Sequence, residues 1–135
     1  MRNYPLQLDK YNISRWRYYE LKAFCRQYDD MRLEADRVIS LHGQDLSGMP
    51  KSTQASMTPV EAAVLRRDRY LRDIEVIEKA AEAAGGGGWK NALINSCCRG
   101  VAHADLDPAD MPSSKREAFF AARREFFWIL DASHK

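Results

Sequence analysis

The apolar residues in the first part of the chain recur at helical intervals. Between about Arg15 and His42 they are separated by gaps of three and four residues, which places them on one face of an amphipathic helix. Ser14 precedes this stretch as a suitable N-cap, and Gly43 follows it as a natural stop. The pattern predicts one long helix with a buried stripe made of Leu21, Phe24, Cys25, Tyr28, Met31, Ala35, Val38 and Ile39.

A second apolar stripe follows a polar segment. Residues 43–58 are rich in Gly, Ser and Thr and read as a flexible linker. Thr58-Pro59-Val60-Glu61 then combines a capping box with proline at the first helical position, so a second long helix is expected to run to about Ala84. Neither helix can bury its stripe alone, so we expect a hairpin or a dimeric bundle. The second stripe comprises Val60, Ala63, Val64, Tyr70, Leu71, Ile74, Ile77, Ala81 and Ala84.

Four consecutive glycines at 85–88 end this pattern, because such a run cannot continue a helix. A shorter helix is predicted from Trp89 to about Arg99, with Gly100 ending it. The pattern over residues 101–111 is ambiguous, and this segment is long enough for one short helix or a turn. The inward residues of the shorter helix are expected to be Trp89, Leu93 and Cys97.

The last helix is predicted to begin near Pro112-Ser113-Ser114 and to run to about Ala132. Ser114 and Glu117 have capping-box spacing. The expected fold is therefore all-α, with a long helical hairpin in residues 1–84 and a small helix-turn-helix-like unit in residues 89–135.

Composition and charge narrow the functional classes. The 135 residues are 45% hydrophobic and 30% charged, which suits one small domain with a modest core. A net charge of +2 argues against a strongly basic arm and against an acidic mimic of DNA, so a nucleic-acid surface would need local clustering of cations. No apolar run approaches the ~20 residues of a membrane span, and the start of the chain lacks the apolar stretch of a signal peptide. We expect a cytoplasmic protein without membrane contact.

Residues with catalytic or metal-binding chemistry form no recognisable motif. The sequence has no nucleophile elbow, zinc-protease helix, phosphate loop or dinucleotide fingerprint, so we expect no enzyme and no cofactor. Three cysteines without CxxC spacing suit a reducing compartment. Cys97, Cys98 and His103 lack a second pair that would complete four zinc ligands. Asp105, Asp107 and Asp110 do not form a calcium-binding loop of the EF-hand type, because the glycine and the terminal glutamate of that loop are missing.

The C-terminal segment has the layout of a DNA-binding helix-turn-helix. Such a motif places the start of its second helix in the major groove of double-stranded DNA. Backbone N–H groups there favour phosphate, arginine can read guanine, and lysine can neutralise phosphate. The predicted DNA-binding residues are Lys90, Arg99, Ser113, Ser114, Lys115, Arg116, Arg123 and Arg124.

Two of these arginines fall on the apolar side of the last helix. Arg116 and Arg123 lie within the arc of its aromatic residues, and they cannot both be fully buried without partners. Either their stems pack on aromatic rings at the margin of the core, or the arc is a surface shared with a partner. The arc itself comprises Phe119, Phe120, Phe126, Phe127 and Leu130.

Three stretches resemble small phage-encoded regulators related to the RinA and ArpU late-gene transcriptional activators. They are Tyr11–Leu21 with the following Phe24–Tyr28, then Arg66–Glu82, and finally Met111–Arg116 with the Phe119-Phe120, Arg123-Arg124 and Phe126–Leu130 groups. The resemblance implies a sigma-factor-like helix-turn-helix at the C-terminal end and a role in phage or prophage transcription. It implies that Lys115 and Arg116 enter the groove, while Lys90, Arg99 and Arg124 reach phosphates.

The low net charge favours a different class of function. In this alternative the chain is a helical protein-interaction module without DNA contact. It would bind host RNA polymerase, serve as an accessory subunit in DNA packaging, or inhibit a host defence nuclease. In both cases the helical hairpin would support a homo-oligomer.

Overall fold

The computed structural model describes residues 12–42 and 58–134, and within this part the chain is helical and contains no strand. This confirms the predicted all-α class. The polar linker predicted over 43–58 lies outside the described residues except for Thr58. The elements in chain order are α1 (Arg15–Arg26), α2 (Tyr28–His42), α3 (Pro59–Ala83), η1 (Ala84–Gly86), α4 (Lys90–Leu93), the π-helical turn η2 (Ile94–Cys98), η3 (His103–Asp105), η4 (Pro108–Asp110) and α5 (Arg116–Ser133).

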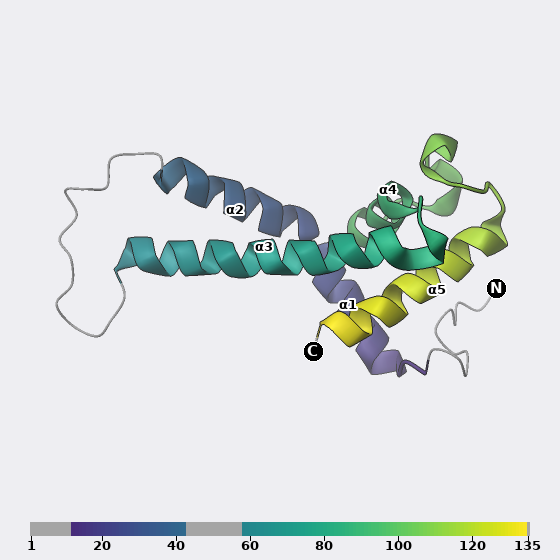
Figure 1. The fold of residues 1–135 in the computed structure, drawn as a ribbon, viewed down its shortest axis with the longest axis horizontal. Coiled ribbons are helices and arrows are strands. Elements are labelled where there is room, and N and C mark those ends of the chain that lie inside the picture. Colours follow the sequence, from purple (N-terminus) through teal and green to yellow (C-terminus); the bar gives the residue numbers. More distant parts are fainter. Residues whose placement is uncertain (1–11, 43–57, 135) are drawn as a thin grey trace.

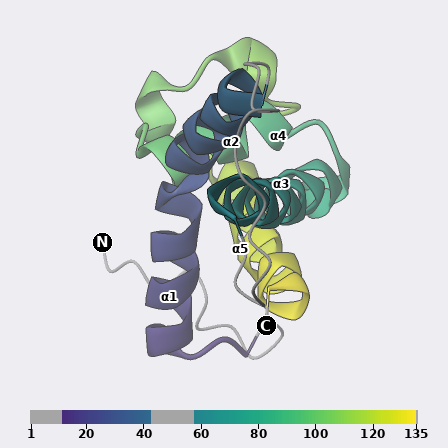
Figure 2. The same ribbon diagram turned by 90° about the vertical axis from the view of Figure 1, so that its left-hand side faces the viewer.

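The first long helix is interrupted at Gln27. Its N-terminal cap is as predicted, because Ser14 Oγ accepts a hydrogen bond from the Arg17 N–H at 3.1 Å. At Gln27 the N–H turns back to the Phe24 carbonyl at 3.1 Å, and α2 leaves in a different direction from α1 (Figures 1 and 2). The prediction of one continuous helix was therefore wrong. Because of the break, the two halves of the apolar stripe pack on different elements: α1 packs on α5 and η2, and α2 packs on α3.

Helices α2 and α3 run antiparallel and form an arm that projects from the rest of the molecule (Figure 1). The predicted cap of α3 is present, with the Glu61 N–H donating to Thr58 Oγ1 at 3.1 Å. A helix of 25 residues is ~37 Å long, so only part of α3 reaches the main body. We call α2 together with residues 59–73 of α3 the arm.

The predicted stripe of α3 is buried only toward its C-terminal end. Ile74, Ile77 and Ala81 are buried as expected, but Leu71 is 38% exposed. Including Leu71 in the core was wrong, and the apolar residues from Val60 to Tyr70 are half-buried or exposed. The reason is tertiary: along the arm α3 has α2 as its main partner in the described chain, whereas beyond Asp73 it also meets α4 and α5.

One hydrophobic cluster joins the N-terminal helices to the C-terminal segment. Side chains of both predicted units, 1–84 and 89–135, share this core. As predicted, Trp89, Leu93 and Cys97 are buried. The largest fully buried side chains are Phe119, Phe126, Phe127, Leu21, Ile77, Leu93, Leu130 and Cys25.

The glycine run makes the tight turn between α3 and α4. Gly85 has φ +64°, and a Cβ there would lie 2.7 Å from Trp89 Cδ1 and 2.8 Å from Ala122 Cβ. The Gly85 N–H also donates to Glu125 Oε1 at 2.9 Å. Glycine at this position therefore permits both the backbone turn and the close approach of α5.

Helix α5 begins later than its sequence suggested. Ser113 Oγ accepts from the Lys115 N–H at 3.2 Å, and the backbone of Lys115 is still extended. The helix starts at Arg116 with Lys115 as N-cap, and no side chain caps it. The predicted capping box of Ser114 and Glu117 was wrong, because the serine hydroxyl that engages the backbone is that of Ser113, two residues before its donor.

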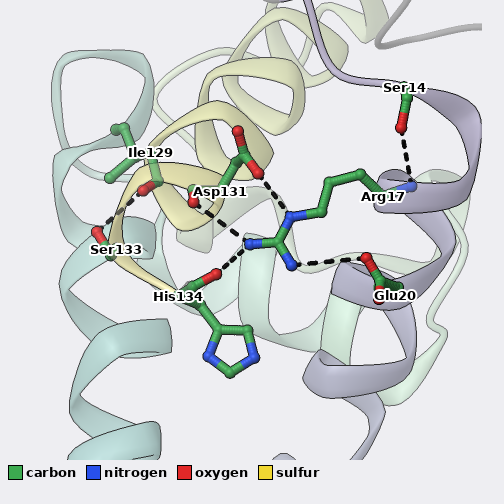
Figure 3. A network of polar contacts seen from close by, with 7 residues as sticks. All are labelled: Ser14, Arg17, Glu20, Ile129, Asp131, Ser133 and His134. Atoms are coloured by element: carbon green, nitrogen blue, oxygen red, sulfur yellow. Dashed lines mark hydrogen bonds and ion pairs between the residues drawn. The ribbon is translucent and has the colours of Figure 1, made fainter.

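The C-terminal end of α5 is fastened to α1 by Arg17 (Figure 3). Arg17 Nε lies 2.6 Å from Asp131 Oδ1, and Nη2 donates to the carbonyls of Asp131 and His134. Nearby, the His134 ring stacks on Phe24 with ring centroids 3.7 Å apart. A cation at these last carbonyls also complements the partial negative charge of a helix C-terminus.

Candidate nucleic-acid interface

The N-terminal end of α5 is the most accessible part of the predicted DNA-binding site. Ser114, Lys115 and Arg116 are exposed and Ser113 is half-buried. The first N–H groups of a helix lack partners within it, and here no side chain takes their place. Within the described residues neither Lys115 nor Arg116 forms an ion pair with a carboxylate. Four consecutive residues of the predicted site are therefore available to an anionic partner.

Two predicted phosphate contacts are instead engaged by carboxylates of the chain itself. Lys90 Nζ lies 3.1 Å from Glu82 Oε1, and Arg99 Nε lies 3.0 Å from Asp29 Oδ2. The hydrogen bond from Arg99 holds the pKa of Asp29 below its ordinary value. Lys90 and Arg99 line a pocket of about 360 Å³ that does not include the start of α5. Lys90 and Arg99 therefore share a pocket with each other and not with Lys115 or Arg116.

Arg123 is not a surface cation. Its residue exposure is 8%, its Nη2 donates to Tyr18 Oη at 2.7 Å, and its Cζ lies 5.1 Å from the centroid of the Phe127 ring. The structure places Arg123 in the core and not on the open surface, because the aromatic arc of α5 faces the core. Arg124, its neighbour, is half-buried, and its Nε is buried without a hydrogen-bond partner in the described part of the chain.

Arg116 and Arg123 both line a pocket of about 400 Å³ beside the start of α5. Arg116 is exposed and its Cζ lies 5.3 Å from the centroid of the Phe120 ring, so it contacts an aromatic ring at the margin of the core, in line with one of the two alternatives predicted. We call this space the arginine pocket. It is lined by Ser96, Val101, Ala102, His103, Ala104, Arg116, Phe119, Phe120 and Arg123.

Two polar members of the arginine pocket, Ser96 and His103, were not predicted as parts of a binding site. Ser96 belongs to the π-helical turn η2, and His103 starts η3. His103 lies with its ring centroid 5.0 Å from that of Phe119, and its Nε2 is buried with no hydrogen-bond partner among the described residues. The only available indication was the placement of Arg116 and Arg123 two turns apart on the aromatic face.

The connection that leads into α5 is looser than a standard helix-turn-helix, in which a turn of three or four residues joins the two helices. Here residues 100–115 separate the end of the π-helical region from α5, and they contain the single 3₁₀ turns η3 and η4. Asp107 caps η4 by accepting from the Ala109 N–H at 2.9 Å. The aspartates of this connection thus include a turn former.

The cysteines are buried thiols without the surroundings of a reactive group. Cys25, Cys97 and Cys98 are all free. Burial raises the pKa of Cys97 to about 12, and the nearby Arg123 guanidinium offsets this only in part. In the described ranges, no group of three or more His, Cys, Asp or Glu side chains is arranged to hold a metal ion.

Among the helices described, none is both long and apolar enough to cross a bilayer. Comparison of the chain with protein-family models, with curated proteins and with solved structures gives no match. The geometry of the start of α5 and of the arginine pocket is therefore the basis for assigning a function.

Proposed function

We propose that the protein binds double-stranded DNA through the start of α5 and regulates transcription, as a phage or prophage regulator would. The observation that carries this proposal is the N-terminus of α5, which no side chain caps, with exposed Lys115 and Arg116 that form no ion pair among the described residues. A helix of 18 residues directs a partial positive charge toward its N-terminus, where its free N–H groups favour phosphate.

Each residue of this end has a distinct role in the proposal. Lys115 neutralises a backbone phosphate, and the hydroxyls of Ser113 and Ser114 donate hydrogen bonds to oxygens of the same phosphates. Arg116, whose guanidinium lies beside the Phe120 ring, contacts a base edge or a second phosphate. Two direct cation–phosphate contacts give modest affinity, which a second copy of the chain would multiply.

The test is retention of duplex DNA from a pool of genomic fragments at low salt. The double variant Lys115→Ala and Arg116→Ala should bind more weakly, and the slope of log affinity against log salt should fall by about two, as expected for two lost phosphate contacts. The matched control is Arg66→Ala with Arg69→Ala, which removes two exposed cations of α3. Helical content by circular dichroism should be unchanged in both double variants.

Equal retention by the α5 variant and the α3 control would contradict the proposal, because bulk positive charge would then explain binding. Absence of retention by the unaltered protein at low salt would contradict it as well. The remaining candidate would then be a protein-interaction module without DNA contact.

A second candidate function, a helical interaction module, is favoured by the arm. Residues 59–73 contain no buried side chain, and Leu65 on α3 and Leu33 on α2 are 52% and 61% exposed. We propose that a second copy of this chain covers the arm. Residues 29–37 carry four acidic and two basic side chains, whereas residues 59–73 carry four basic and three acidic ones. A two-fold pairing of α2 with the partner's α3 therefore joins opposite net charges.

This pairing is tested by the molar mass in solution, measured by light scattering over a range of concentrations. The unaltered chain should reach the mass of a dimer, and Leu33→Lys with Leu65→Lys, which places like charges on both faces, should remain a monomer. Trp16→Lys is the matched control, because Trp16 is an exposed apolar residue of α1, outside the arm. A monomeric mass for the unaltered chain at every concentration would exclude self-association.

A further inference from the structure

The guanidinium of Arg123 is a buried cation without a compensating anion. Only 8% of the residue is exposed, and its Nη1 is buried without a hydrogen-bond partner in the described parts of the chain. Its hydrogen bond to Tyr18 Oη goes to a neutral phenol. None of the ion pairs described involves Arg123.

The thiols near Arg123 do not supply the missing negative charge. Burial raises the pKa of Cys97 to about 12, and a hydrogen bond with Cys98 together with burial raises the pKa of Cys25. Both thiols are thus neutral at physiological pH. The rings of Tyr18 and Phe127, with centroids 5.7 and 5.1 Å from Arg123 Cζ, stabilise the cation in part but carry no net charge.

Burying a charge is strongly unfavourable unless the charge is paired. An anion bound beside Arg123 would therefore stabilise the buried guanidinium. The arginine pocket gives an anion access to Arg123. Three further donors line the same space: the guanidinium of Arg116, the hydroxyl of Ser96 and the ring of His103, whose Nε2 is itself buried without a partner in the described chain.

We propose that the arginine pocket binds the phosphate group of a nucleotide. Two guanidinium groups, an imidazole and a hydroxyl provide more donors than the two oxygens of a carboxylate use, and they suit the several oxygens and the larger charge of a phosphate. The volume of about 400 Å³ exceeds the space of a phosphate alone. Phe120 and His103 also line the pocket, and rings of this kind suit contact with a base.

This phosphate has two possible sources, a free nucleotide or the backbone of a bound nucleic acid. The free-nucleotide source is independent of the proposed DNA binding, whereas the backbone source rests on it. The two are separated by measuring nucleotide binding in the absence of DNA.

The first experiment is calorimetric titration of the full chain with adenosine monophosphate and with inorganic phosphate, at constant ionic strength. Saturable binding is expected. Arg116→Gln should raise the dissociation constant ~10-fold or more, because it removes a charge-assisted hydrogen bond. Arg123→Met should abolish binding. The matched control Arg69→Gln, an exposed arginine of α3 outside the pocket, should bind as the unaltered chain does.

Arg116→Gln keeps the test decisive if Arg123→Met fails to fold, because Arg116 is exposed and packs only at the core margin. The free source is supported if adenosine monophosphate binds more tightly than inorganic phosphate in the absence of DNA. The backbone source is supported if both ligands bind weakly and displace DNA at fixed ionic strength. In that case Lys115→Ala should weaken DNA retention without changing phosphate binding, which keeps the two proposals distinguishable.

The inference is overturned if neither ligand binds at millimolar concentration, or if Arg116→Gln and Arg69→Gln bind phosphate equally. Either result would mean that Arg123 is held as a structural cation by Tyr18 and the aromatic rings alone.

Discussion

At the scale of single residues, the partner of each cation decides what it can do. Arg99 is held by Asp29, Lys90 by Glu82 and Arg17 by the end of α5, whereas Lys115 and Arg116 have no carboxylate partner in the described structure. Some basic residues therefore stabilise the fold through ion pairs, and others face solvent. The proposed DNA contacts belong to the second group.

Arg17 is expected to contribute measurably to stability because it satisfies carbonyls at the end of α5. Arg17→Met keeps the apolar stem and should lower the free energy of unfolding by about 1–2 kcal/mol, a value reduced for the partial exposure of Arg17 and Asp131. Lys79→Met is the control, since its pair with Glu75 is exposed and should contribute less to stability than the Arg17 contacts do. Urea unfolding of the two variants measures the difference, and equal losses would contradict this role.

Tyr28 should make stability fall in alkaline solution. Burial, and then the hydrogen bond to Glu78, raises the pKa of Tyr28 to about 12. Because the folded-state pKa is raised, the contribution of the neutral phenol is fully present below the unfolded-state pKa of about 10 and is lost as pH rises through about 12. Between these values the melting temperature of the unaltered protein should fall more steeply than that of Tyr28→Phe. Parallel curves would show that Tyr28 is not the group responsible.

At the scale of elements, the burial and the packing partners of a helix change along its length. The stripe of the first long helix is divided at Gln27 between two packing partners, and that of α3 changes from half-buried in the arm to buried after Asp73. Helical periodicity is the same on both sides of each change. The changes therefore come from where neighbouring helices end, and not from the local pattern.

A matched pair of substitutions in α3 tests this division. Ile77 is fully buried, so Ile77→Ala should cost ~2–5 kcal/mol. Leu71 is 38% exposed, so Leu71→Ala should cost less than ~1 kcal/mol despite its place in the predicted stripe. Thermal melts of the two variants measure the contrast. A loss for Leu71→Ala as large as that for Ile77→Ala would place Leu71 in the core.

The glycine run allows a similar contrast. Gly86→Ala meets no atom within 4 Å and should cost about 1–2 kcal/mol from its positive φ alone. Gly85→Ala has the same type of backbone penalty and also brings its Cβ against Trp89 and Ala122, so it should be more destabilising. Chemical denaturation orders the two variants, and equal stability would mean that Trp89 moves aside at little cost.

At the scale of the whole molecule, the structure combines a core shared by N- and C-terminal helices with an arm that has little core of its own (Figure 1). The arm carries the surface proposed for a second copy, and α5 carries the surface proposed for DNA. A two-fold dimer would present two copies of the α5 N-terminus, which is how dimeric regulators contact paired half-sites.

This organisation predicts a gradient of hydrogen-exchange protection along α3. Amides of residues 59–73 should exchange faster than those of residues 74–83, because local opening is easiest where few side chains are buried. If the arm pairs with a second copy, protection of 59–73 should rise with protein concentration while that of 74–83 stays constant. Mass-spectrometric exchange at two concentrations tests both statements. Uniform protection along α3 would contradict the first.

The sequence by itself determined the features that depend on near neighbours along the chain. The caps at Ser14 and Thr58, the end of α3 before the glycines and the all-α class follow from hydrogen bonds and spacings within a few residues. Such interactions form in any fold that contains these segments.

Only the tertiary structure decided the break at Gln27, the exposure of Leu71 and the environment of each basic residue in the predicted site. Arg99 meets Asp29 and Arg123 meets Tyr18, and the partners in these pairs lie 70 and 105 residues apart in the chain. Spacing along one helix shows that Arg123 lies on the aromatic face. The same spacing does not show which distant side chain contacts that arginine. It also does not show that a pocket forms beside the arginine, or that part of its guanidinium has no partner in the described structure.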